Sequence, residues 1–202
     1  MAKEYMMSLI LVLTFLVLAS CSTKSRMDAN VPNTILIEDF SKDSGVSTLG
    51  TKWMMFTDQV MGGISKGGYT FETVDGKKCI RLQGDVSLEN NGGFVQVALP
   101  LEIDGKAIDA SLYKGVRLEV KGNNNDYYVH LRTNKTWLPW QFYDASFFAP
   151  DTWKTVEIPF SSFTPYSLKS KLNTAKLKRI AVVAFKKQFH ADIYVSRIEF
   201  YR

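Results

Sequence analysis

Two neighbouring stretches, Val116-Arg-Leu-Glu-Val-Lys121 and Tyr127-Tyr-Val-His-Leu-Arg132, decide the fold class of this chain. In both, an aliphatic or aromatic residue alternates with a more polar one. Because successive side chains of a β-strand point to opposite faces, this period of two predicts strands with one buried and one solvent-facing side. If the two strands pair, one face of their sheet carries a polar row: Arg117, Glu119, Tyr128, His130 and Arg132.

Strand signals continue outward from this centre through the region 34–202. No segment there keeps a helical period over about twelve residues. Asp75-Gly76 is a strong hairpin signal, because both residue types tolerate the backbone of a tight turn. Further strands are predicted over 34–40, 53–60, 69–74, 78–83, 93–99, 153–158, 177–185 and 191–200, with short helical turns near 109–113 and 161–163. Short strands joined by turns predict one all-β domain, a sandwich or a barrel.

The composition excludes several classes of protein. The chain has 202 residues, with 25 Lys and Arg against 20 Asp and Glu, and a net charge of +5. Aromatic residues make up 13%, enough to build a packed core, which excludes a disordered chain. Two cysteines cannot form a disulfide scaffold, and two Cys with two distant His match no zinc-ligand spacing. We expect neither a cofactor nor a metal.

The N-terminal segment resembles an export signal followed by a tether. The apolar run Met6–Leu18 is shorter than the roughly 20 residues that span a membrane, so residues 1–20 predict a signal peptide. Leu18-Ala-Ser-Cys21 resembles the bacterial lipobox, in which the Cys21 thiol receives a lipid; an ordinary signal peptide cut nearby is the alternative. Residues 21–33 then form a flexible tether. We expect a lipid-anchored protein of the bacterial cell envelope, at the outer membrane, with no nucleic-acid partner.

Two glycine-rich stretches stand out, Asp58-Gln-Val-Met-Gly-Gly-Ile-Ser65 and Glu89-Asn-Asn-Gly-Gly93. Glycine permits close backbone approach, and short polar side chains bond turn amides, so tight corners of a sandwich are one interpretation. The other interpretation is a ligand or partner site where the corners converge, with contacts from Asp58, Ser65, Asn90 and Asn91. Calcium also suits such oxygens, although the spacing matches no calcium loop; its ligands would be Asp58, Asp85, Glu89 and Asn90.

The same stretches, taken with their flanks, resemble the CIA30 family, named after the complex I intermediate-associated protein 30. The matching pieces are Trp53, Asp58–Ser65, Gly84-Asp-Val-Ser-Leu-Glu-Asn-Asn-Gly-Gly-Phe94 and Trp153-Lys-Thr-Val-Glu-Ile-Pro-Phe160. The resemblance covers roughly 35–201. It implies a galactose-binding-domain-like fold, which is a jelly-roll β-sandwich. For mitochondrial members it also implies a role in assembling respiratory complex I.

An aromatic segment, Trp137-Leu-Pro-Trp-Gln-Phe-Tyr-Asp144, suggests a carbohydrate site. Flat rings stack on the C–H faces of pyranose sugars, and neighbouring polar groups bond the hydroxyls. The candidate contacts are Tyr128, His130, Arg132, Trp137 and Trp140. Aromatic residues of a sandwich also fill cores, which is the competing interpretation of this segment and the preferred one for Trp53 and Trp153.

The sequence contains no recognised catalytic motif. His130 and His190 stand apart from any nucleophile motif, and no phosphate loop or zinc-protease motif occurs. The remaining enzymatic interpretation is glycoside cleavage by a pair of carboxylates. The candidates for this pair are Asp58, Asp85, Asp126 and Asp144. We therefore expect a non-catalytic envelope binding module that acts in protein interaction or complex assembly, with carbohydrate binding as the alternative.

Overall fold

The structure, a computed structural model, describes residues 31–42 and 45–202. The chain divides into two units, Met1–Asn33 and Thr34–Arg202, and the second holds every strand described below. The predicted signal peptide, Cys21 and most of the predicted tether lie outside the described residues. Within the described part, no helix has the length and apolar character needed to cross a membrane.

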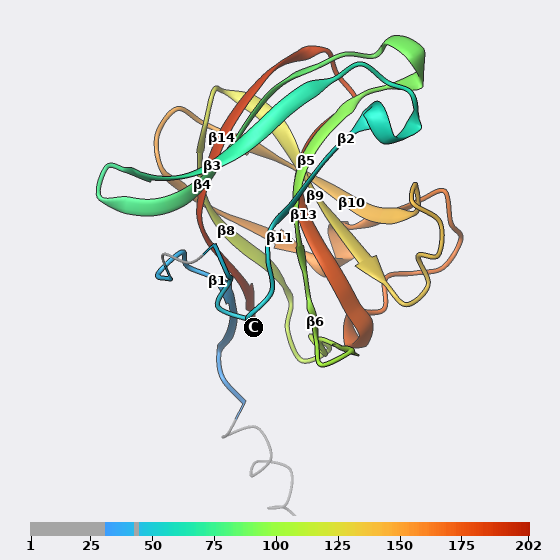
Figure 1. The fold of residues 1–202 in the computed structure, drawn as a ribbon. Coiled ribbons are helices and arrows are strands. Elements are labelled where there is room, and N and C mark those ends of the chain that lie inside the picture. Colours follow the sequence, from blue (N-terminus) through green and yellow to red (C-terminus); the bar gives the residue numbers. More distant parts are fainter. Residues whose placement is uncertain (1–30, 43–44) are drawn as a thin grey trace, which may run out of the picture. The chain divides into compact units, whose positions relative to one another are not determined.

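Two antiparallel sheets build the domain (Figure 1). The first sheet has the order β11 (Lys154–Pro159), β8 (Gly115–Gly122), β14 (Phe189–Tyr201), β4 (Lys77–Val86) and β3 (Lys66–Val74), with β1 (Thr34–Glu38) also paired to β14. The second has the order β12 (Thr164–Tyr166), β10 (Phe142–Ala149), β9 (Asn125–Thr133), β13 (Leu177–Phe185), β5 (Phe94–Pro100) and β2 (Met54–Thr57). β6 (Glu102–Ile103) and β7 (Lys106–Ala107) form a separate small pair.

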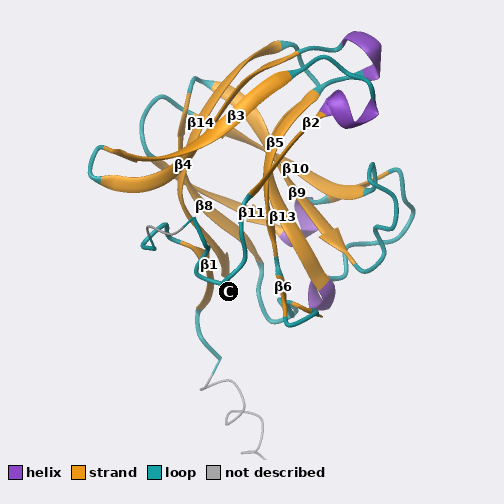
Figure 2. Ribbon diagram, in the orientation of Figure 1, coloured by secondary structure: helices purple, strands orange, loops and turns teal. Residues whose placement is uncertain are grey.

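Helical structure is confined to short 3-10 turns in the described residues, drawn purple in Figure 2. They are η2 (Asp58–Met61), η3 (Glu89–Asn91), η4 (Phe160–Ser162) and η5 (Thr174–Lys176). The predicted helical turn near 161–163 is confirmed by η4. The one expected near 109–113 is instead a single hydrogen-bonded turn, in which the Tyr113 amide donates to the Ala110 carbonyl over 3.0 Å.

The core lies between the inner faces of the two sheets. Val116, Leu118 and Val120 of β8 are fully buried, and so are alternate residues of β9, Tyr127, Val129 and Leu131. Both sets belong to one hydrophobic cluster that draws on both sheets. Trp53 is buried in this cluster, as expected. The predicted jelly-roll β-sandwich is confirmed.

β8 and β9 do not pair, so the predicted polar row is wrong. β8 lies between β11 and β14, whereas β9 lies between β10 and β13 in the other sheet. The chain crosses between sheets at Asn123 and Asn124, where Asn124 is left-handed (φ 58°) and its amide donates to Ala149. The alternating pattern shows which side chains of a strand are buried. The pattern is the same whether two strands pair within one sheet or lie in opposite sheets of the sandwich. Consequently Arg117 and Glu119 lie in the first sheet and Tyr128, His130 and Arg132 in the second.

Two further expectations are settled by the packing. The Asp75-Gly76 hairpin is confirmed between β3 and β4, with both residues left-handed at φ 52° and 76°. Trp153 is not a core residue: it is only partly buried, and its indole N–H donates to the Asp75 carboxylate over 3.1 Å. Its position just before β11, an edge strand, leaves it at the margin of the sandwich. Cys79, a residue of β4, is buried at 1% exposure.

Candidate functional site

The two glycine-rich stretches meet around one buried carboxylate. Asp58 is inaccessible to solvent, and it accepts hydrogen bonds from the Ser65 amide at 2.9 Å and the Gly93 amide at 2.6 Å. The Ser65 hydroxyl also donates to it, and the Phe94 amide lies 3.3 Å away. A carboxylate that accepts several backbone donors is well compensated for its burial. Asp58 therefore ties η2 to the start of β5.

The glycines of the motif make room for this carboxylate. A Cβ atom on Gly63 would overlap Asp58, and one on Gly92 would lie 2.5 Å from the Asp58 Oδ2 atom. Asp58 and Ser65 are both fully buried, so a partner has no access to their side chains. The corner interpretation thus fits these two residues, and the partner-contact interpretation does not.

The remaining candidate residues of the glycine corners are Asn90 and Asn91. Asn90 is exposed and left-handed, with φ 56°, a conformation that Asn tolerates better than most residues. The side chain of Asn91 lies outside the described residues. Among the described residues, no three His, Cys, Asp or Glu side chains gather as a metal site would require.

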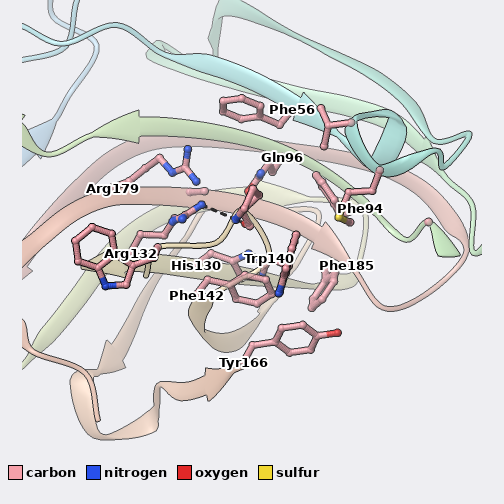
Figure 3. Close-up of a pocket in the computed structure, with 16 residues that line it drawn as sticks. Phe56, Phe94, Gln96, His130, Arg132, Trp140, Phe142, Tyr166, Arg179 and Phe185 are labelled. Atoms are coloured by element: carbon pink, nitrogen blue, oxygen red, sulfur yellow. Dashed lines mark hydrogen bonds between the residues drawn. The ribbon is translucent and has the colours of Figure 1, made fainter. Parts of the chain in front are cut away.

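A cleft of about 450 Å³ opens on the outer face of the second sheet (Figure 3). Its floor contains Ala181 of β13, whose cross-strand partner on β5, the fully buried Ala98, packs in the same small hydrophobic cluster. Small side chains here leave a hollow, because the neighbouring positions carry rings that rise from the sheet. The aromatic lining comprises Phe56, Phe94, Trp137, Trp140, Phe142, Tyr166 and Phe185. Val60, Met61 and Gly92 close the end nearest the glycine corners.

One wall of the cleft is the loop between β9 and β10, and Arg132 holds it in place. The Arg132 guanidinium donates to the carbonyls of Thr136 (2.9 Å), Leu138 (2.8 Å) and Pro139 (3.1 Å). The loop presents Trp137 at 83% exposure, the largest exposure among the large hydrophobic residues of the described chain. Arg132 was predicted as a ligand contact; most of its donors are used to position this loop.

His130 forms a buried part of the cleft rather than a polar contact. Its ring stacks on Phe142 with centroids 3.9 Å apart, and its Nε2 atom is buried without a hydrogen-bond partner. Desolvation, aided by the positive charges of Lys186 and Arg179, lowers the pKa of His130 to about 3. The imidazole is therefore neutral at physiological pH.

Arg179 and Gln96 are the polar lining residues that sequence reasoning missed. Arg179 follows the first residues of β13 and stands opposite Arg132, its cross-strand partner on β9. Its guanidinium lies over the Phe56 ring, 5.4 Å from the centroid. Burial, with a contribution from Arg132, lowers the pKa of Arg179 to about 10. The available signal was a charged residue in a strand, 177–185, that is otherwise apolar after its start.

The remaining predicted residues fall around the cleft or away from it. Trp137, Trp140, His130 and Arg132 all line it, and Tyr128 lies beside it, with its ring 5.6 Å from that of Phe185. The four aspartates proposed for glycoside cleavage do not line it. Asp144 binds Lys186 at 2.6 Å, exposed Asp85 binds His190 at 2.7 Å, and Asp126 is exposed near the start of β9.

The fold and the cleft together define a class, the jelly-roll β-sandwich with a concave site on the outer face of one sheet. A family model places the chain more narrowly: residues 39–191 match complex I intermediate-associated protein 30 (CIA30), and the chain belongs to that family. No curated protein matches the sequence.

Solved structures with the same fold include carbohydrate-binding modules. One is the family 11 module of the cellulosomal cellulase Lic26A-Cel5E of Clostridium thermocellum, with a TM-score of 0.65 and 15% identity over 85% of this chain and 95% of that chain. Another is a family 30 carbohydrate-binding module, with a TM-score of 0.52 and 14% identity over 69% of this chain and 81% of that one. At these identities the likeness establishes the fold alone.

Proposed function

We propose that the protein is a non-catalytic glycan-binding module and that the cleft on the second sheet holds the sugar chain. The observation that carries the proposal is the pair Trp137 and Trp140, whose rings stay exposed on a loop that Arg132 anchors. Large apolar rings are normally covered, and exposed ones beside a cavity mark a binding surface. The side chain of Gln96 has no hydrogen bond to another described residue, so its amide is free for sugar hydroxyls.

The structural neighbours support this proposal. The family 11 module of Clostridium thermocellum was solved in complex with a β-1,3-1,4-mixed-linked tetrasaccharide, at a TM-score of 0.65 to this chain. A sandwich of this kind therefore suits an extended sugar. None of the four aspartates lines the cleft, which also favours binding over hydrolysis there, because a glycosidase needs two carboxyl groups that flank the scissile bond.

The experiment is isothermal titration calorimetry of the full chain, in non-ionic detergent, against neutral and acidic oligosaccharides. Trp140→Ala removes a stacking ring, and Ala181→Leu fills the floor of the cleft. Each substitution is expected to lower affinity at least tenfold without changing the thermal midpoint by more than a few degrees. Trp153→Ala is the matched control, since it removes a partly buried tryptophan away from the cleft and should leave affinity unchanged.

Failure of every saccharide to bind the folded protein would contradict the proposal. So would unchanged affinity in Trp140→Ala and Ala181→Leu, because these substitutions alter a wall and the floor of the cleft. Circular dichroism on each variant separates a lost site from a lost fold.

A second candidate function is protein docking at the glycine corners, in keeping with the assembly role in the family name. Apolar side chains gather there in the open: Val60, Met61, Ile64 and Leu88 are 43–67% exposed. Exposed apolar patches of this kind are characteristic of protein interfaces. In-cell crosslinking with affinity capture tests it. Ile64→Ser with Leu88→Ser should abolish recovery of a reproducible partner, while Ala181→Leu should not.

We also propose that a lipid on Cys21 holds the domain in the bacterial cell envelope, at the outer membrane. The lipobox-like sequence Leu18-Ala-Ser-Cys21 supports this placement. A sugar-binding or partner-binding cleft would then act at the surface to which the tether reaches.

A further inference from the structure

The cleft contains positive charge that the protein itself does not neutralise. Arg132 and Arg179 both line it, and no Asp or Glu is among its lining residues. The two arginines are direct cross-strand partners, an arrangement in which like charges repel and destabilise a sheet. Arg132 is compensated by loop carbonyls. The Arg179 guanidinium has no hydrogen bond or ion pair with any other residue that the structure describes, and its contact is with the Phe56 ring.

Arginines of the first sheet, unlike Arg179, form ion pairs with carboxylates. Arg81 binds Asp192 at 2.9 Å, Arg117 binds Glu199 at 2.6 Å, and Arg197 binds Glu199 at 2.9 Å. Lys186, near the cleft, is likewise paired with the buried carboxylate of Asp144. The fold thus matches these cations with carboxylates and leaves Arg179 unmatched at the floor of an aromatic cleft. The Phe56 ring covers one face of the guanidinium, which leaves its N–H edge for a ligand.

We propose that the natural ligand is an acidic polysaccharide and that its negatively charged substituent, a carboxylate or a sulfate ester, pairs with Arg179. This inference rests on the proposed glycan-binding function. A planar guanidinium presents parallel N–H donors that match the oxygens of such an anion. The neighbouring rings stack on the sugar, Gln96 bonds a hydroxyl, and Arg132 adds to the positive potential. A neutral glucan would leave the unpaired charge of Arg179 uncompensated in the complex.

The test compares saccharides that share a backbone and differ only in charge. Oligogalacturonate is titrated against its methyl ester, and a sulfated carrageenan oligosaccharide against its desulfated form. At least one acidic member is expected to bind tenfold or more tighter than its neutral counterpart, and that preference should fall as salt rises. The pair that shows the preference identifies the substituent as a carboxylate or a sulfate.

Variants assign the preference to Arg179. Arg179→Gln should lower affinity for the acidic sugar about tenfold to a hundredfold, the range expected for a hydrogen bond to a charged group, and leave the neutral sugar unaffected. Arg179→Lys should retain part of the preference. Lys106→Gln removes an exposed cation on β7, outside the cleft, and should change nothing.

Three results would overturn the inference. Equal binding of the charged and neutral members in both pairs would reject the acidic ligand while preserving glycan binding. An acidic preference that persists in Arg179→Gln would reject the role of Arg179. Absence of binding to any sugar would reject the glycan function, and this inference with it.

Discussion

At the scale of single residues, the carboxylate of Asp58 is fully buried and held by several backbone donors. Asp58→Asn replaces one acceptor oxygen with an NH₂ group that faces backbone N–H donors such as Gly93 N, 2.6 Å away. Leaving buried donors unpaired should lower the free energy of unfolding by about 3 kcal/mol. Urea denaturation followed by circular dichroism measures the loss. Asp85→Asn is the control, because that aspartate is exposed and should tolerate the change.

This prediction also distinguishes the two interpretations of the glycine corners. A variant as stable as the wild type that fails to capture a partner would identify Asp58 as a contact residue. Loss of stability instead assigns the motif to folding, with Gly63 and Gly92 retained because a Cβ atom on either would collide with the Asp58 carboxylate.

His130 predicts how stability depends on pH. Its pKa is about 3 in the folded protein and about 6.5 in an unfolded chain, so the unfolded state binds a proton first as pH falls. The contribution of neutral His130 is complete above pH 6.5 and declines below it. At pH 4 the folded state should have lost roughly 3 kcal/mol from this group. Urea denaturation at pH 7 and pH 4 should show a smaller difference in His130→Phe than in the wild type; equal differences would contradict the assignment.

At the scale of elements, Arg132 determines whether the loop between β9 and β10 is part of the site. Arg132→Lys replaces a fork of donors with one ammonium group that cannot reach the Thr136, Leu138 and Pro139 carbonyls together. We expect amide hydrogen exchange in residues 134–140 to accelerate and sugar affinity to fall about tenfold, while global stability changes little. Lys135→Gln, an exposed substitution in the same loop, should have neither effect. Weaker binding without faster exchange would make Arg132 a direct ligand contact.

The strands also show which parts of the fold can be predicted from the sequence. The interiors of β8, β9 and β13 follow from their apolar pattern, because burial is encoded residue by residue. The separation of β8 from β9 into different sheets depends on contacts distant in sequence, which alternation does not encode. The strand β10 was missed because its tryptophan-rich approach was interpreted as one aromatic segment. Within the site, Trp137 and Trp140 could be predicted because stacking rings and polar side chains fall together in the short segment 137–144.

The hollow itself was beyond sequence reasoning. It depends on the small side chain of Ala181 in β13, whose importance is visible only once β13 is paired with β5 and β9. Arg179 was likewise visible as a charge in an apolar strand, but its significance comes from facing Arg132 across the sheet. Pairwise contacts between distant strands, rather than local patterns, create the cleft.

At the scale of the whole molecule, the reactivity of the two cysteine thiols tests both the lipid anchor at Cys21 and the burial of Cys79. Cys79 lies in β4 at 1% exposure, and burial together with Glu72 raises the pKa of its thiol to about 11. Both effects suppress the thiolate that reacts with labelling reagents. If Cys21 carries the proposed lipid, protein purified from membranes should therefore show no rapidly reacting thiol when native and one when denatured in guanidinium.

The number of reactive thiols in the denatured protein depends on whether Cys21 carries a lipid, so this number tests the lipid anchor directly. The sequence has two cysteines, and a second thiol in the denatured protein would mean that Cys21 is free and that the lipid anchor is absent. Cys21→Ser removes the attachment point, and the protein should then leave the membrane fraction while its thermal midpoint stays the same, since the core lies within Thr34–Arg202. Cys79→Ala is the complementary control: it should abolish the denatured thiol signal and leave membrane association intact. If the Cys21→Ser protein remained on membranes, the domain itself would hold it there. The exposed apolar corner around Ile64 and Leu88 would then be the surface that contacts the membrane.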